Sequence, residues 1–201
     1  KVTVESMCEK YEEFLIDESK YGGWAKSISF PETETEVCEI LRQMALERVP
    51  VTIQGGKTGI TGGAVPRGGH ILNLSRMNRV LDTGKREDGT CVVTVEPGVT
   101  LLDLEKAVLK AFGREKVFWP VQPTEKSATV GGIAATGAQG PNEYAYGDSS
   151  QYILEARMAC ADGSVVTLTG DSLGEMLGRE GIAGVFTALT LRLAAKPEDL
   201  W

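Results

Sequence analysis

The sequence of 201 residues predicts an α+β fold built from two subdomains. Three observations support this prediction. Amphipathic helical stretches alternate with short apolar runs in the first part of the chain, whereas longer β-branched runs dominate the second part. Hydrophobic residues make up 42% and charged residues 24%, a balance that allows one core or two closely packed cores. We place the first subdomain at residues 1–87 and the second at residues 88–201.

The first subdomain opens with two predicted helices. Residues 4–15 place apolar side chains at helical spacing: Val4, Met7, Cys8, Tyr11, Phe14 and Leu15. The second helix begins at Thr33 with Glu36 three positions on, which is the pattern of a capping box. Its apolar face comprises Val37, Ile40, Leu41, Met44 and Ala45. Short strands are expected at 50–53, 70–74 and 79–83.

The second subdomain begins with a β-branched strand at 91–98 that Pro97 and Gly98 end. A helix follows over 100–112, with Thr100 as its N-cap and Leu101, Leu104 and Val108 facing inward. Residues 153–169 predict two strands joined at Asp162-Gly163, a strong hairpin signal. A last strand places Leu189, Leu191 and Leu193 on one face.

Charge and cysteine usage exclude several classes of protein. The net charge is −7 and the 21 basic residues are scattered, so neither a nucleic-acid surface nor an anionic-membrane surface is indicated. No apolar run reaches the ~18 residues of a membrane span, and the first residues do not have the form of a signal peptide. The four cysteines are widely spaced and lack companion histidines, which argues against a metal site. Reduced thiols make the cytoplasm the expected compartment.

The stretch VTIQGGKTGITGG, residues 51–63, contains the letters GKT with which a Walker A loop ends. That motif also needs a glycine where this chain has Val51, and a helix that starts at the lysine. The residues after Thr58, ITGGAVPRGG, do not form a helix. A P-loop nucleotide-binding protein is therefore a remote alternative, which an ATP-binding assay would test.

Glycine is concentrated in a few loops, with 24 glycines in all. They cluster at 55–63, at 68 and 69, at 128–141 and at 177–186. Glycine lets a backbone approach a ligand closely, and successive N–H groups then form an anion-binding site without formal charge. Tight turns alone would also explain such loops. The residues by themselves leave both interpretations open.

Seven collinear motifs in this chain resemble the FAD-binding domain of FAD-linked oxidases, in the vanillyl-alcohol oxidase superfamily. They run in order as PVTIQGGKTGITGGAVP, GGHILNLSRMNRV, VTVEPGVTLLDL, PTEKSATVGGIAATGAQGP, YGD, ADG and GREGIAGVFTALTLRL. The similarity extends from about Phe14 to Leu193 and is greatest to the glycolate oxidase and D-lactate dehydrogenase flavoproteins. It implies the two-subdomain FAD-binding fold of the vanillyl-alcohol oxidase type.

The resemblance also implies which residues contact a noncovalent FAD. The segment expected to wrap the diphosphate consists of Gln54, Gly55, Gly56, Lys57, Thr58, Gly59 and Ile60. Beside the flavin and ribityl chain it implies Thr124, Glu125, Lys126, Ser127, Ala128, Thr129, Val130, Gly131 and Gly132. The turn that follows near the phosphates and ring comprises Thr136, Gly137, Ala138 and Gln139. The adenine end is expected at Glu180, Gly181, Gly184 and Val185, within the segment up to Phe186. A branched side chain at Gly56 is expected to weaken FAD binding while the fold survives.

The chain departs from the family pattern at several positions. Lys57 stands where relatives usually carry glycine or a small polar residue, or a histidine that links to the flavin, so that type of covalent attachment is excluded. Its side chain would either pair with the diphosphate or point to solvent. Arg179 replaces a common serine, and residues 137–139 read GAQ in place of NAG. The sole histidine, His70, is interpreted as a structural histidine at the surface, with a catalytic base as the alternative.

By this resemblance the chain is the FAD-binding domain or subunit of an oxidoreductase that acts on a 2-hydroxy acid such as glycolate or D-lactate, with hydride passing to flavin N5. The flavin carries the redox chemistry and the protein orients it. A cap domain or partner subunit after residue 201 is expected to complete the substrate pocket, and no catalytic residue is assigned. The alternative is a non-catalytic FAD-binding or electron-relay subunit.

Overall fold

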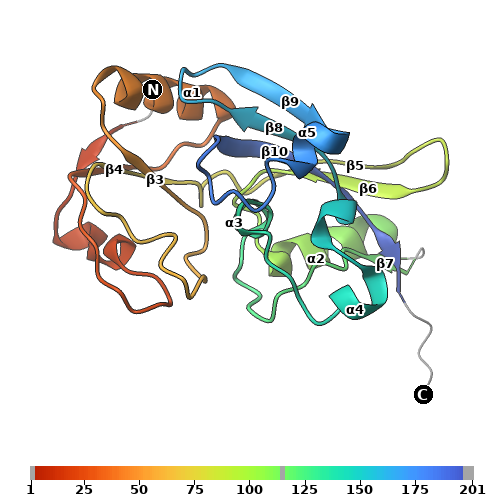
Figure 1. The fold of residues 1–201 in the computed structure, drawn as a ribbon. Helices are drawn as coiled ribbons and strands as arrows, with labels where there is room; N and C mark the ends of the chain where they lie inside the picture. The colour runs from red at the N-terminus through yellow and green to blue at the C-terminus, as the bar shows by residue number, and fades with distance from the viewer. Residues whose placement is uncertain (1–2, 114–115, 197–201) are drawn as a thin grey trace.

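The computed structural model describes residues 3–113 and 116–196 (Figure 1), within which two larger β-sheets and one two-stranded sheet form. The first sheet has the strand order β1-β2-β4-β3. Its strands are β1 (Glu5–Ser6), β2 (Ser27–Ser29), β3 (Val51–Gln54) and β4 (His70–Asn73). Strands β2, β4 and β3 run parallel, and β1 lies antiparallel to β2 at the edge. The strands expected near residues 50 and 70 are thereby confirmed.

The helix predicted over residues 4–15 is wrong in its first half. Glu5 pairs with Ile28 and Ser6 with Ser27, so the chain starts as an edge strand and only residues Glu9–Leu15 form a 3₁₀ helix, η1. Because Glu5 and Ser6 pair with β2, their backbone hydrogen bonds go to the sheet and not to a helical turn. Tyr11 of η1 is still buried, in a small core with Ile28 and Ile71.

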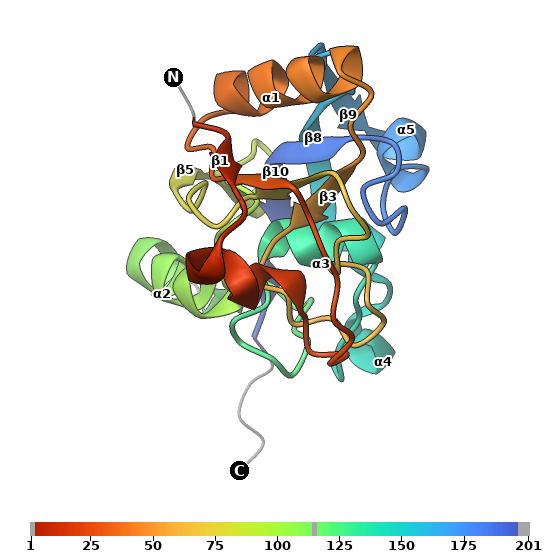
Figure 2. The same cartoon turned by 90° about the vertical axis from the view of Figure 1, so that its left-hand side faces the viewer.

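Helix α1 (Glu34–Leu46) connects β2 to β3 and lies along one side of both sheets (Figure 2). Thr33 caps it by accepting a hydrogen bond from the Glu36 N–H at 3.3 Å. The Glu36 carboxylate accepts instead from the Glu32 N–H, so only the first half of the predicted capping box forms. The predicted apolar face is buried, except that Ala45 is exposed.

The apolar face of α1 joins the two sheets. It packs in one buried cluster with Leu72 of the first sheet and with Ala159 and Val185 of the second. The Glu34 carboxylate binds the Arg157 guanidinium at 2.6 Å and accepts a hydrogen bond from the Thr187 hydroxyl at 2.6 Å. Burial and these polar contacts fix the orientation of the two sheets.

The second sheet is antiparallel throughout, with the order β5-β6-β10-β8-β9. Its strands are β5 (Val80–Lys85), β6 (Cys91–Val95), β8 (Ile153–Ala159), β9 (Val165–Thr169) and β10 (Val185–Arg192). The predicted hairpin at Asp162-Gly163 is confirmed, since β8 pairs with β9. The change from one sheet to the other falls between Asn73 and Val80, whereas residue 87 lies in the turn between β5 and β6. The subdomain boundary at 87 stays a prediction.

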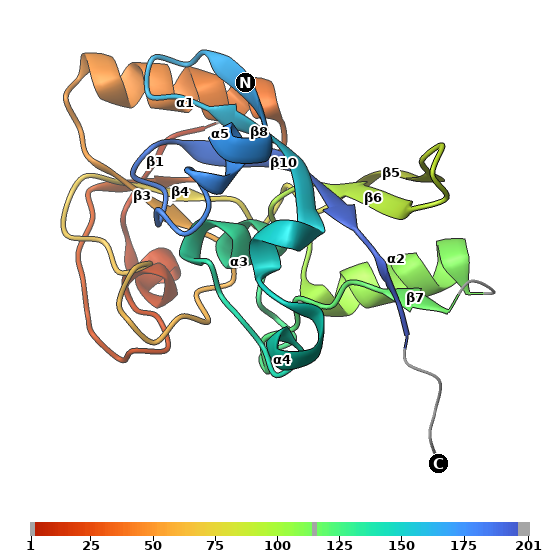
Figure 3. The same cartoon turned by 45° about the vertical axis from the view of Figure 1, so that its right-hand side comes forward.

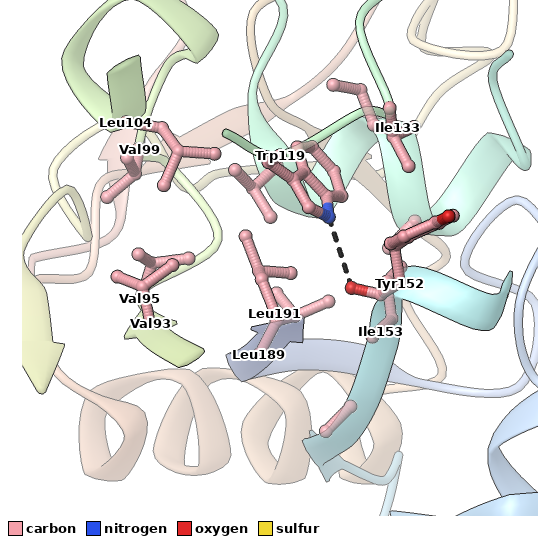
Figure 4. Close-up of a cluster of buried hydrophobic side chains, with 14 of the residues drawn as sticks. Val93, Val95, Val99, Leu104, Trp119, Ile133, Tyr152, Ile153, Leu189 and Leu191 are labelled. Carbon is pink, nitrogen blue, oxygen red and sulfur yellow. Dashed lines mark hydrogen bonds between the residues drawn. The ribbon is translucent and has the colours of Figure 1, made fainter. Parts of the chain in front are cut away.

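The largest core lies between this sheet and helices α2 (Leu101–Phe112) and α3 (Val130–Thr136). Thr100 caps α2 as predicted, accepting from the Asp103 N–H at 3.2 Å. Figure 4 shows Trp119 in this core, where its indole Nε1 donates to the Tyr152 carbonyl at 3.1 Å. Trp119 is 2% exposed, so this donor would be unsatisfied without that carbonyl.

Short elements complete the second half. They are β7 (Val117–Phe118), α4 (Glu143–Tyr146), the 3₁₀ helix η2 (Ser149–Tyr152), α5 (Gly170–Gly174) and β11 (Ala194–Ala195). Strands β7 and β11 pair with each other beside α2, as Figure 3 shows. Within the described part of the chain, no helix combines the length and apolar character needed to cross a membrane.

Candidate functional site

The glycine loop between β3 and β4 is anchored by Gln54, the last residue of β3. Its side-chain amide donates to the carbonyl of Phe14 at 2.8 Å and to that of Ala64 at 2.7 Å, and its amide oxygen accepts from Asn73 at 3.3 Å. Gln54 is fully buried and does not line a cavity. Its side chain therefore holds the two ends of the loop and the N-terminal segment together.

The first glycines of this loop pack against another loop of the protein. A Cβ at Gly56 would lie 2.6 Å from the Ser127 carbonyl oxygen, and one at Gly55 would overlap the Thr129 hydroxyl. Gly56 thus needs to be glycine because another backbone approaches it, and Gly55 because the Thr129 side chain packs against it. The expectation that a branched side chain at Gly56 spares the fold is wrong, since it would push the two loops apart.

Two later glycines are different. Neither Gly59 nor Gly63 has a positive φ, and both line a cavity. A Cβ at Gly59 would meet nothing within 4 Å, and one at Gly63 would approach only the Thr61 hydroxyl, at 3.9 Å. Neither backbone geometry nor packing within the protein requires glycine at these positions. The space that a side chain would fill is left open to a ligand.

The second segment, residues 124–132, leads into α3. Thr129 is 4% exposed and caps this helix by accepting from the Gly132 N–H at 3.3 Å. Thr124, Glu125, Ala128, Thr129, Gly131 and Gly132 line the cavity. The remaining predicted positions do not, for reasons visible in the structure. Lys126 forms an ion pair with Glu105, the Ser127 hydroxyl donates to Glu125 at 2.7 Å, and Val130 lies in the core.

The end of α3 supplies the third segment. Gly137 adopts the left-handed conformation, with φ 62°, and ends the helix; it does not line the cavity. Thr136, Ala138 and Gln139 do line it. The GAQ departure therefore keeps glycine where the helix cap needs it and presents an amide side chain at the cavity.

The fourth segment, between α5 and β10, is docked onto α3. The Glu180 N–H donates to the Ala135 carbonyl at 2.7 Å. Glu180, Gly181, Gly184 and Val185 all line the cavity, as predicted. Arg179 is turned back, donating to the Glu175 carbonyl at 2.9 Å, and does not line it. The Arg179 side chain, which stands in place of the family's serine, therefore does not contribute to the cavity lining.

These four segments, far apart in the sequence, enclose one cavity of about 460 Å³ between the two sheets and α3. Further lining residues that the sequence did not single out are Ile53, Thr61, Gly63, Ala64, Leu74, Pro97, Pro123, Ile133, Ala135 and Phe186. Most flank a predicted segment directly. Leu74 and Pro97 are exceptions. The Leu74 N–H donates to the Gln54 carbonyl at 2.9 Å and the Gly131 N–H donates to the Pro97 carbonyl at 2.8 Å, so each is held beside a predicted segment.

A second cavity, of about 500 Å³, lies between α2 and β7. Its lining is mainly apolar and comes from residues 101–122 and Lys196. None of the glycine clusters at 55–63, at 68 and 69, at 128–141 and at 177–186 contributes to this second cavity. The glycine motifs therefore identify the first cavity as the candidate site.

Charge in the first cavity is sparse. Lys57 is the only basic residue that lines it, and Glu125 and Glu180 are its acidic residues, among those the structure describes. The Lys57 ammonium has contacts within the protein that neither expected arrangement included. It donates to the Glu13 carbonyl at 2.5 Å and lies 4.4 Å from the centroid of the Phe14 ring. Partial burial lowers the pKa of Lys57 below its usual value.

His70 lies away from this cavity, in β4. Its ring is fully buried, with Nδ1 2.8 Å from the Ser27 hydroxyl and Nε2 2.7 Å from the Ser29 hydroxyl. Burial lowers the pKa of His70 from 6.5 to about 4. Both ring nitrogens are thus held by serine hydroxyls within the protein, as a structural role requires, but the expected position at the surface is wrong, because the ring is fully buried.

Comparison with known proteins gives consistent results. The family model described as "FAD binding domain" matches residues 25–169. A D-lactate dehydrogenase from Anaerostipes hadrus is 33% identical, over 94% of this chain and 41% of that protein. Glycolate oxidase subunit GlcD from Bacillus subtilis (strain 168) is 28% identical, over 89% of this chain and 39% of that protein.

A solved structure of alkyldihydroxyacetonephosphate synthase superposes with a TM-score of 0.75 at 24% identity, covering 87% of this chain and 35% of that one. At this level of identity the similarity concerns the fold. The chain spans 41% and 39% of the lengths of the two relatives named above.

Proposed function

Since this chain belongs to the FAD binding domain family, we propose that it is the flavin-binding part of an oxidoreductase that acts on a 2-hydroxy acid such as glycolate or D-lactate. The cofactor is FAD. The predicted fold of the vanillyl-alcohol oxidase type and the predicted family are confirmed. The substrate class is taken from the names of the relatives.

FAD would lie in the cavity of about 460 Å³, with its diphosphate along residues 55–60. The observation that carries this placement is the open space at Gly59 and Gly63, which neither packing nor backbone conformation explains. Backbone amides can approach a phosphate oxygen closely at such positions. Because the net charge of −7 does not attract an anion to the protein, the anion has to be held locally, and backbone N–H groups can do this without a formal charge.

The other three segments would hold the rest of the cofactor. Thr124, Glu125 and Thr129 are proposed to lie beside the ribityl chain and flavin, Gln139 near the ring, and residues 180–185 at the adenine end. The buried residues behind them, Gln54 among these, position the loops. FAD, when bound, supplies the redox chemistry by accepting a hydride at N5. Attachment is proposed to be noncovalent, which is supported by the lack of any histidine or cysteine among the described lining residues.

Part of the substrate site is proposed to come from outside these residues, in a further domain or a partner subunit. The greater length of the relatives supports this, since the chain spans 41% of one and 39% of the other. We also propose a cytoplasmic location, supported by four cysteines that are all free. A non-catalytic FAD-binding or electron-relay subunit is the alternative function.

Anaerobic addition of D-lactate or glycolate to the FAD-loaded protein tests the activity. A 2-hydroxy-acid oxidoreductase would bleach the visible absorbance of the bound flavin, and L-lactate serves as the matched control for stereochemistry. An electron-relay subunit would be bleached by a chemical reductant and by neither acid. That second outcome in the full-length protein would overturn the proposed activity and leave FAD binding intact.

A further inference from the structure

Lys57 has a backbone conformation that is unfavourable for its residue type. Its φ is 56°, in the left-handed region that glycine adopts readily and other residues rarely do. The neighbouring positions 55, 56 and 59 are glycine. A lysine at such a position has a less favourable backbone free energy than glycine, so contacts of its side chain must offset that cost.

The side chain of Lys57 binds the N-terminal segment, residues 13–18. Its ammonium donates to the Glu13 carbonyl at 2.5 Å and lies 4.4 Å from the Phe14 ring centroid, a cation–π distance. On the other side of the same residue, the Lys57 carbonyl accepts a hydrogen bond from the Glu18 N–H at 3.2 Å. Lys57 thus contacts both ends of the segment.

The segment is itself tied to the first sheet. The Phe14 ring packs edge-on against Phe30 with centroids 5.2 Å apart, and the Phe14 carbonyl accepts from the Gln54 amide at 2.8 Å. A loop held against this segment is therefore held against the core of the first subdomain. Gln54 fixes the start of the loop, and Lys57 fixes its middle.

Asp17 supplies an independent observation. It is 5% exposed, and its Oδ2 atom has no hydrogen-bond partner among the described residues. Its carboxylate interacts favourably with the Lys57 ammonium through space. Burial lowers the pKa of the Lys57 ammonium, whereas attraction to the carboxylates of Glu13 and Asp17 raises it to a smaller extent and favours keeping the ammonium beside this segment.

We propose that Lys57 is a positioning residue that latches the glycine loop onto residues 13–18 and so holds the loop in the geometry that binds the FAD diphosphate. It acts through Glu13 and Phe14 and is not the counter-ion of the phosphates. The inference rests on FAD binding in this cavity.

The test compares three substitutions in the 201-residue chain, with FAD affinity measured by flavin fluorescence titration at low and high salt. Lys57→Gly relieves the left-handed strain and removes the latch, and Phe14→Leu removes the ring under the ammonium. Lys57→Gly is expected to weaken FAD binding roughly tenfold, because a partly buried cation–π contact and a hydrogen bond are lost, and Phe14→Leu roughly threefold, because only the cation–π contact is lost. Lys57→Arg keeps both contacts and is expected to bind within about threefold of the original chain.

Amide hydrogen exchange of the FAD-free protein gives a readout that does not depend on the cofactor. Residues 13–18 and 55–59 should exchange faster in Lys57→Gly and in Phe14→Leu than in the unmodified chain. The two effects should not add in the double variant, because both remove one latch. Arg48→Gly is the matched control, since Arg48 also has a left-handed φ, 54°, and does not line the cavity. It should leave FAD affinity and exchange in both segments unchanged.

A counter-ion role would give the opposite result for Phe14→Leu. Freeing the ammonium would then leave FAD affinity equal or higher, and Lys57→Gly would lose affinity together with salt dependence. Equal affinity and exchange in Lys57→Gly and the unmodified chain would also overturn the proposal. If the unmodified chain takes up no FAD, the placement of the cofactor fails, while the exchange measurements still decide whether the latch exists.

Discussion

The buried histidine makes a quantitative prediction about stability against pH. His70 has a pKa of about 4 in the folded protein because its ring is fully buried. The unfolded chain has the ordinary value of ~6.5. Between these two values the unfolded state binds more protons than the folded state, so stability falls as the pH falls through this window.

The size of the loss follows from the two pKa values. Between pH 7.5 and pH 5 the free energy of unfolding should decrease by about 2 kcal/mol on account of His70, and by about 3 kcal/mol at pH 4. Urea denaturation at these pH values, with ionic strength held constant, measures the loss. In His70→Gln this part of the pH dependence should disappear, whatever the variant's stability at pH 7.5.

The pKa of the ring can also be measured directly. His70 is the sole histidine in the sequence, so its ring protons give a single unambiguous NMR titration. A folded-state pKa close to 6.5 would refute the reasoning, as would equal pH dependence of stability in His70→Gln and the unmodified chain. Either result would mean that water or a charged group reaches the ring.

Three further substitutions test the site and the core. Gly59→Val should weaken FAD binding by at least about tenfold with little change in melting temperature, because its side chain fills open cavity space. Gly22→Val is the control, since a Cβ there also meets nothing within 4 Å but lies outside the cavity, and it should change neither FAD affinity nor melting temperature. Gln54→Leu should lower the free energy of unfolding by about 2 kcal/mol and weaken FAD binding, since the Phe14 and Ala64 carbonyls lose their donor. Trp119→Phe should cost about 2 kcal/mol of stability in urea denaturation with little change in FAD affinity, because a buried hydrogen bond and some packing are lost at a residue that does not line the cavity.

Local signals in the sequence predicted those elements whose structure is decided locally. The cap at Thr33, the cap at Thr100 and the turn at Asp162-Gly163 are confirmed, because each depends on residues within a few positions. The helix predicted over residues 4–15 failed for the opposite reason. Whether Glu5 joins a strand depends on Ile28, which is distant in the sequence.

The candidate site was predicted at the level of segments and less well at the level of side chains. Glycine content and the family motifs identified all four segments that meet at the cavity. The sequence does not distinguish a cavity-lining glycine with open space beside it, such as Gly59, from one that another loop touches, such as Gly56. Gln54 and Lys57 each donate a hydrogen bond to a carbonyl of the N-terminal segment, that of Phe14 and that of Glu13, and no spacing rule links these partners.

FAD uptake by the purified chain is the measurement that tests the central claim most directly. The protein is incubated with excess FAD, separated from free cofactor, and then denatured, with the visible flavin absorbance recorded before and after. We predict an equimolar amount of bound FAD, all of which separates from the polypeptide on denaturation. A folded chain that retains no flavin would contradict the account of the cavity, and a flavin that stays with the denatured polypeptide would contradict noncovalent binding.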